Sequence, residues 1–130
     1  GEGNGGVAVP AVHATHDSAA AIGLLLGHLA GQKRALSELV ADLPTLSMRK
    51  IAIPVPPSLI YSALAEFRDA VGDVEGVTVD HTDGVKLVWP DGWVHVRASN
   101  TQSLVRIIAE AEGAPRAQEL LDWARERLKA

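Results

Sequence analysis

The sequence lacks cysteine, which excludes disulfide bonds and thiolate metal ligands. It also lacks a long apolar run: residues 19–29 form the longest, and Gly23, Gly27 and His28 interrupt it. That run is too short to cross a bilayer, and no secretory signal is visible. Positive charge is not in excess, because the formal net charge is -4. We therefore expect a cytoplasmic protein without a nucleic-acid or membrane partner.

What is present indicates a folded globular chain. Of its 130 residues, 47% are hydrophobic and 22% are charged, which suits one domain, or one domain plus a piece of another. Residue 1 is glycine, and residues 1–6 are rich in glycine. We expect an excised fragment; the alternative is that these six residues remain from cloning.

The first 45 residues show helical patterning. Asp17 is a typical N-cap, followed by an alanine- and leucine-rich helix to about residue 30, with Gly31 as the expected stop. A shorter helix is expected over 35–42. Apolar residues occur on several sides of the first helix, which favours burial on more than one side. We interpret residues 1–45 as the tail of an α/β domain.

Residues 46–130 show a different pattern. The strand and helix signals follow one another as strand, helix, three meander strands, a crossover strand and a final helix. The expected strands are 48–53, 76–80, 85–89, 93–97 and 104–111, and the helices begin at Pro57 and Pro115. This order predicts an α+β fold: a four- to five-stranded, mainly antiparallel sheet with helices on one face.

A polar loop between the last two strands is a candidate anion site. Arg97 and Arg106 offer permanently charged, forked donors, and Ser99, Asn100 and Thr101 offer polar side chains. A tight loop can also direct successive backbone N–H groups at one anion. The alternative is an ordinary loop, because serine, asparagine and threonine are common in turns.

Histidines and tryptophans allow further interpretations. His95 shares a strand face with Arg97, so it either helps to hold an anion or is a solvated sheet residue. His13 and His16 precede the helix and have no third ligand nearby, so no metal site is expected. Trp89 and Trp93 bracket a turn and are expected to pack across strands, with sugar stacking as the alternative.

The polar loop carries a family resemblance. The run Arg97-Ala98-Ser99-Asn100-Thr101 resembles the phosphate-binding loop in the last domain of the α-D-phosphohexomutases, such as phosphomannomutase, phosphoglucomutase and phosphoglucosamine mutase. The runs around this loop are similar to that domain as well. They are Asp83-Gly84-Val85-Lys86, Asp91-Gly92-Trp93-Val94, Leu104-Val105-Arg106 and Glu110-Ala111. Residues 1–6 resemble the sugar-binding loop of the third domain.

The resemblance implies a role for each part of the chain. Residues 1–45 would be the end of domain 3, with Glu2 and Asn4 reading sugar hydroxyls. Residues 46–130 would be domain 4, whose phosphate ligands are Arg97, Ser99, Asn100, Thr101 and Arg106. The ligand would be a hexose phosphate, moved between its 1- and 6-positions through a bisphosphate intermediate.

The same resemblance implies what this chain would not supply. In the family a phosphoserine in domain 1 transfers the phosphoryl group, and Mg²⁺ held by an aspartate loop in domain 2 supports the transfer. We therefore expect no catalytic residue, metal or cofactor in this chain, no activity from it alone, and the missing domains as its partners. Stand-alone modules that bind a sugar phosphate, or that only interact with proteins, are the alternatives.

Four positions depart from the family pattern. Gln102 stands where Glu or Thr is frequent, and Ser103 stands where Pro is usual. Gly6 replaces a frequent His, and His16 replaces a frequent Arg. Losing the proline is expected to loosen the loop slightly. These changes bear on sugar preference more than on phosphate binding.

Overall fold

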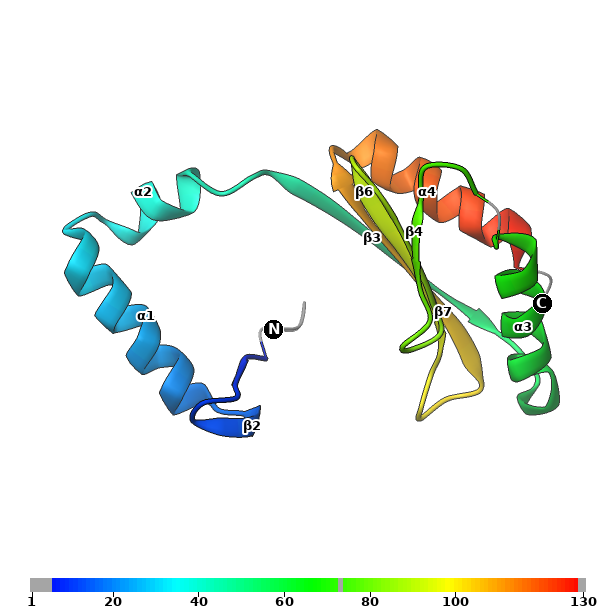
Figure 1. Ribbon diagram of the computed structural model, residues 1–130, viewed down its shortest axis with the longest axis horizontal. Coiled ribbons are helices and arrows are strands. Elements are labelled where there is room, and N and C mark those ends of the chain that lie inside the picture. Colours follow the sequence, from blue (N-terminus) through cyan, green and yellow to red (C-terminus); the bar gives the residue numbers. More distant parts are fainter. Residues whose placement is uncertain (1–5, 73, 129–130) are drawn as a thin grey trace. The chain divides into compact units, whose positions relative to one another are not determined.

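The chain forms two compact units, residues 1–43 and 44–130. The computed structural model describes residues 6–72 and 74–128 (Figure 1). Glu2 and Asn4, the predicted sugar ligands, lie outside the described residues. Within the described part of the chain, none of the helices has both the length and the apolar character needed to span a membrane.

The first unit contains a small hairpin and two helices. Strands β1 (Ala8–Val9) and β2 (His13–His16) pair in antiparallel fashion, a hairpin that the sequence patterns did not indicate. Helix α1 (Ser18–Gln32) is followed by α2 (Leu36–Ala41). Asp17 is the N-cap of α1, as predicted, and its Oδ1 accepts from the Ala20 N–H at 2.9 Å.

The predicted stop of α1 at Gly31 is wrong. The helix continues to Gln32, and Lys33 takes the left-handed conformation that ends it, with φ of 52°. Glycine is preferred at this position but is not required, because an L-residue can adopt φ > 0 at a modest cost. Gly31 therefore lies in the last turn of α1.

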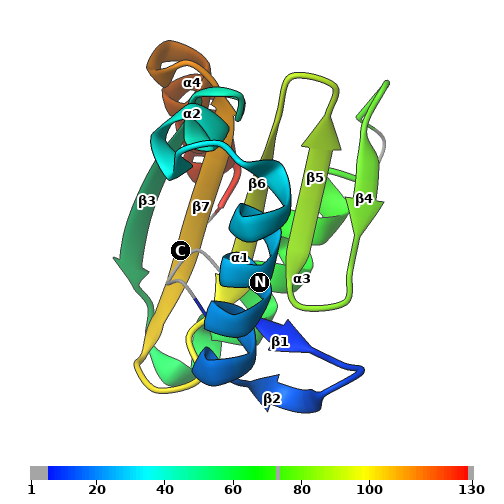
Figure 2. The same cartoon turned by 90° about the vertical axis from the view of Figure 1, so that its left-hand side faces the viewer.

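The second unit is built on a five-stranded antiparallel sheet, with strand order β3-β7-β6-β5-β4 (Figure 2). Its strands are β3 (Leu46–Pro54), β4 (Thr78–Asp80), β5 (Val85–Trp89), β6 (Gly92–Ala98) and β7 (Leu104–Glu112). A 3₁₀ turn, η1 (Pro57–Leu59), leads into α3 (Ile60–Ala70), and α4 (Ala114–Arg127) ends the unit. Both α3 and α4 cover the same face of the sheet, so the predicted α+β fold is confirmed (Figure 1).

Strand alternation decides which side chains form the core of this unit. Val105, Ile107 and Ala109 alternate along β7 and are fully buried beneath the helices. Phe67 of α3 and Leu120 of α4 pack into the same cluster. Burying large apolar side chains contributes about 1.5–3 kcal/mol each, so this cluster holds the sheet and both helices together.

The opposite face of the sheet, which we call the outer face, carries polar side chains. Directly opposed residues on neighbouring strands share a face, and Arg97 pairs with Arg106 while His95 pairs with Ile108. Lys86 of β5 lies opposite His95 in the same way. The outer face therefore carries Arg97 and Arg106, the two arginines of the predicted anion site.

The two tryptophans occupy different faces of the sheet. Trp93 lies on the outer face, where its Nε1–H donates to Glu110 Oε1 at 3.1 Å and the Lys86 ammonium lies 4.3 Å from its ring centroid. Trp89 instead packs edge-on against Trp123 of α4, with ring centroids 5.4 Å apart. Trp93 therefore makes the expected contacts across strands, whereas Trp89 joins the sheet to a helix.

Candidate functional site

The loop of residues 99–103 joins β6 to β7 and is closed by backbone hydrogen bonds at its base. The Ser99 N–H donates to Leu104 O at 3.0 Å, and the Leu104 N–H donates to Gln102 O at 2.9 Å. The loop is also fastened to the end of β3, because the Val55 N–H donates to Ser103 O at 3.2 Å. These bonds hold the loop in a tight curve without using its central amides.

The central amides of the loop are not used by the hydrogen bonds that close it. Within residues 6–72 and 74–128, the N–H groups of Asn100, Gln102 and Ser103 have no hydrogen-bond acceptor. The Thr101 N–H makes only a long contact, 3.5 Å, to Ser99 Oγ. Asn100, Thr101 and Gln102 are exposed. Neighbouring backbone donors of this kind can converge on a phosphate or carboxylate.

Two arginines flank this loop on the outer face. Arg97, near the end of β6, and Arg106, near the start of β7, are directly opposed in the antiparallel ladder. The Arg106 guanidinium makes no hydrogen bond or ion pair among the residues described. Two cations side by side, one without a counter-ion, create a local positive potential in an otherwise acidic chain.

Asp83 is the carboxylate that reaches this arginine pair. Its Oδ2 accepts from Arg97 Nη1 at 3.0 Å, and it belongs to the turn between β4 and β5. The His95 Nε2 lies 2.5 Å from Asp83 O, and because a carbonyl only accepts, that nitrogen carries the proton. Asp83 stands in a run that resembles the family but had no predicted role in the site, and nothing in its spacing indicated a contact with Arg97.

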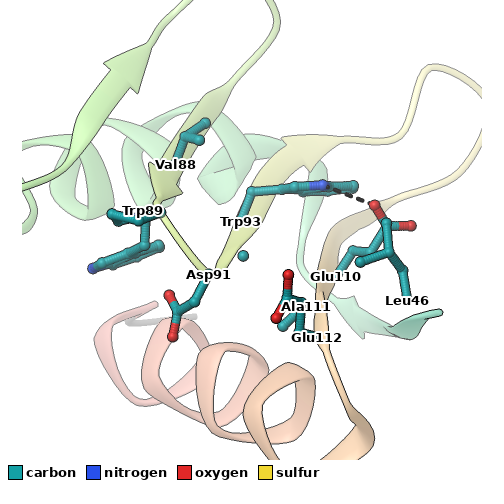
Figure 3. A pocket seen from close by; sticks show the side chains of 10 residues that line it. Leu46, Val88, Trp89, Asp91, Trp93, Glu110, Ala111 and Glu112 are labelled. Atoms are coloured by element: carbon teal, nitrogen blue, oxygen red, sulfur yellow. Dashed lines mark hydrogen bonds between the residues drawn. The ribbon is translucent and has the colours of Figure 1, made fainter. Parts of the chain in front are cut away.

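A separate shallow pocket lies at the far end of the same strands. It has a volume of about 190 Å³, and Leu46, Trp93, Glu110 and Glu112 are among its lining residues (Figure 3). Trp93 lies four positions before Arg97 along β6, a distance of about 13 Å. None of the predicted phosphate ligands lines this pocket.

The predicted phosphate ligands are brought together by the fold. Ser99, Asn100 and Thr101 lie in the loop between the strands that carry Arg97 and Arg106. His95 lies on the same face but is bonded to the Asp83 carbonyl. In the described ranges, no group of three or more His, Asp or Glu residues could hold a metal, and His13 bonds Thr15 at 2.7 Å instead.

An antiparallel sheet with two helices on one face defines an α+β domain, and an arginine-flanked polar loop joins two of its strands. Residues 59–126 match the sequence family of the phosphoglucomutase/phosphomannomutase C-terminal domain. The chain belongs to this family.

Curated relatives agree along nearly the whole chain. A probable phosphoglucosamine mutase of Methanopyrus kandleri is 35% identical over 126 residues, which cover 94% of this chain and 27% of the relative. A phosphoglucomutase/phosphomannomutase of Thermococcus kodakarensis is 34% identical over 124 residues, covering 94% of this chain and 26% of the relative. This chain thus spans about a quarter of the length of these mutases.

A solved structure supports the same assignment. A phosphoglucomutase/phosphomannomutase family protein from Burkholderia thailandensis aligns with a TM-score of 0.56 and 25% sequence identity. The alignment covers 72% of this chain and 19% of that protein. Sequence and fold therefore point to one family.

Proposed function

We propose that residues 46–130 hold the phosphate group of a hexose phosphate within a phosphohexomutase. One observation carries this proposal: Arg97 and Arg106 are directly opposed beside a loop with unpaired amides. Both guanidinium groups offer charged, forked donors suited to phosphate, and each can bind two of its oxygens. The mutase names of the relatives support a hexose phosphate as the substrate class.

Each polar side chain of the loop has a role in this proposal. The Ser99 and Thr101 hydroxyls and the Asn100 side-chain amide donate to phosphate oxygens that the arginines leave free. The amides of Gln102 and Ser103 complete the cradle. A clamp on the phosphate that does not react fixes the position of the sugar ring relative to the reacting groups, and phosphoryl transfer depends mainly on such positioning.

We place the transfer chemistry elsewhere in the enzyme. In this proposal, the metal that would support transfer belongs to another domain, as does the phosphoserine. Residues 1–45 would contribute the end of domain 3, with Glu2 and Asn4 contacting sugar hydroxyls. The chain by itself is then a binding part without mutase activity.

The test is a titration of the ¹⁵N-labelled chain, followed by amide NMR. Mannose 6-phosphate is expected to shift the amides of residues 99–103 with a Kd of about 1 mM, or roughly -4 kcal/mol. Mannose, which has no phosphate, is expected to leave these signals unchanged. Arg97→Ala is expected to abolish the shifts.

Arg125→Ala is the matched control, because Arg125 is an exposed arginine on α4, across the sheet from the loop. It is expected to bind as the unaltered chain does. Shifts that fall outside the loop, or that mannose produces equally well, would refute the proposed site.

A further inference from the structure

The turn that carries Asp83 contacts Arg97 through an ion pair. We propose that Asp83 is a positioning residue of the phosphate site: it holds the Arg97 guanidinium so that its remaining N–H groups face the ligand. This inference rests on the proposed function, because it assigns a role within the same site. Nothing in the sequence motif of the loop itself includes Asp83.

The ion pair leaves Arg97 free to bind. Its guanidinium has five N–H donors, of which the contact to Asp83 uses one, on Nη1. The Arg97 side chain keeps 30% of its surface exposed, so a ligand can reach the other donors. A long, flexible side chain that is already held in one geometry loses less conformational entropy when a ligand binds.

Gly84 and His95 fix the Asp83 turn against β6. Gly84 has φ of +73°, and a Cβ there would collide with Val96 O and would lie 2.9 Å from Arg97 Cα. The His95 ring donates to Asp83 O at 2.5 Å from the same strand. The turn is therefore bonded to β6 through Asp83 O and lies close against it at Gly84, which restricts the movement of Asp83.

Asp83 and Arg106 lie on opposite sides of Arg97 in the strand order. Asp83 reaches Arg97 from the β5 side of β6, whereas Arg106 lies on β7 and the loop of residues 99–103 joins β6 to β7. A carboxylate on the far flank of the guanidinium orients it, while one on the loop side would compete with phosphate. The strand order therefore favours Asp83 as a support for Arg97 rather than as a competitor of the phosphate.

The experiment measures the binding of inorganic phosphate to the full chain by amide NMR. Asp83→Ala is expected to weaken binding three- to tenfold. Asp83→Asn keeps an oxygen that can accept from Arg97, so it is expected to weaken binding less than Asp83→Ala. In the free protein, the Nε–Hε signal of Arg97 is expected to broaden in Asp83→Ala, while the amide signals of residues 99–103 stay in place.

Asp91→Ala is the matched control, since Asp91 forms a similar ion pair with Arg116 at 2.8 Å, at the other end of the strands. It is expected to leave phosphate affinity within twofold of the unaltered chain. Tighter binding by Asp83→Ala, or equal binding, would overturn the inference while leaving the proposed function intact. If the unaltered chain binds no phosphate, the proposed function fails and the inference fails with it.

Discussion

Arg97 on β6 and Arg106 on β7 lie directly opposite each other, so two positive side chains share one position of the sheet. Like charges in this arrangement destabilise a sheet. Asp83 neutralises Arg97, but Arg106 has no counter-ion in the parts of the chain that the structure describes. In the proposed site, a bound anion would offset this repulsion between the two arginines.

Arg106→Gln is therefore expected to change stability and binding in opposite directions. Removing one of the two like charges should leave the free energy of unfolding unchanged or raise it by up to about 1 kcal/mol. The same variant should lose phosphate affinity about tenfold or more, because a charge-assisted hydrogen bond disappears. Urea unfolding at low salt and a phosphate titration measure the two effects, and loss of stability without loss of binding would contradict the account.

Gly84→Ala is expected to destabilise the second unit by about 1–3 kcal/mol. The new methyl group would meet Val96 O and Arg97, and the residue would keep a positive φ. Gly76→Ala is the control, because Gly76 has φ of +74° but open space around its Cβ position. Gly76→Ala should lower the free energy of unfolding only by the cost of a positive φ, about 1 kcal/mol. Equal losses in thermal unfolding would show that contact with Arg97 is unimportant.

Asp91 is expected to make stability depend on pH. The hydrogen bond from the Arg116 side chain lowers the pKa of the Asp91 carboxyl in the folded state. A depressed folded-state pKa stabilises the fold above the unfolded pKa, and that stabilisation is lost as the pH falls through the folded value. The stability difference between the unaltered chain and Asp91→Asn should thus be full at pH 7 and shrink below about pH 4. A difference that stays constant down to pH 2 in urea titrations would exclude this linkage.

Phe67→Ala is expected to reduce the free energy of unfolding by about 3–5 kcal/mol, because Phe67 is fully buried between α3 and the sheet. Tyr61, on the same helix, has 80% of its surface exposed. Tyr61→Ala should therefore change stability by no more than about 0.5 kcal/mol. Similar losses for the two variants would mean that α3 does not pack as described.

Much of the second unit could be predicted from its sequence, because strand alternation and helical spacing both indicate which side chains share a buried face. Alternation puts Val105 and Ile107 on one face of β7, and the structure shows that this face is the buried one. The end of α1 was misjudged, since Lys33 rather than a glycine adopts the left-handed conformation. The preference for glycine at the end of a helix is weak, because another residue can adopt a positive φ there at a small cost in free energy.

The candidate site was only partly predictable. The loop residues form one continuous run, and the opposition of Arg97 and Arg106 follows from two strands joined by a short loop. Asp83 was missed because its contact with Arg97 depends on how the turn before β5 packs on β6. A contact between residues fourteen positions apart requires the strand register, which local patterns do not contain.

The most direct test of the phosphate site is a crystal structure of this chain soaked with a hexose 6-phosphate. The account predicts the phosphorus atom within reach of both the Arg97 and Arg106 guanidinium groups, with the amides of residues 100–103 donating to its oxygens. Ligand density in the pocket beside Trp93 and Glu110, with none at the loop, would contradict it.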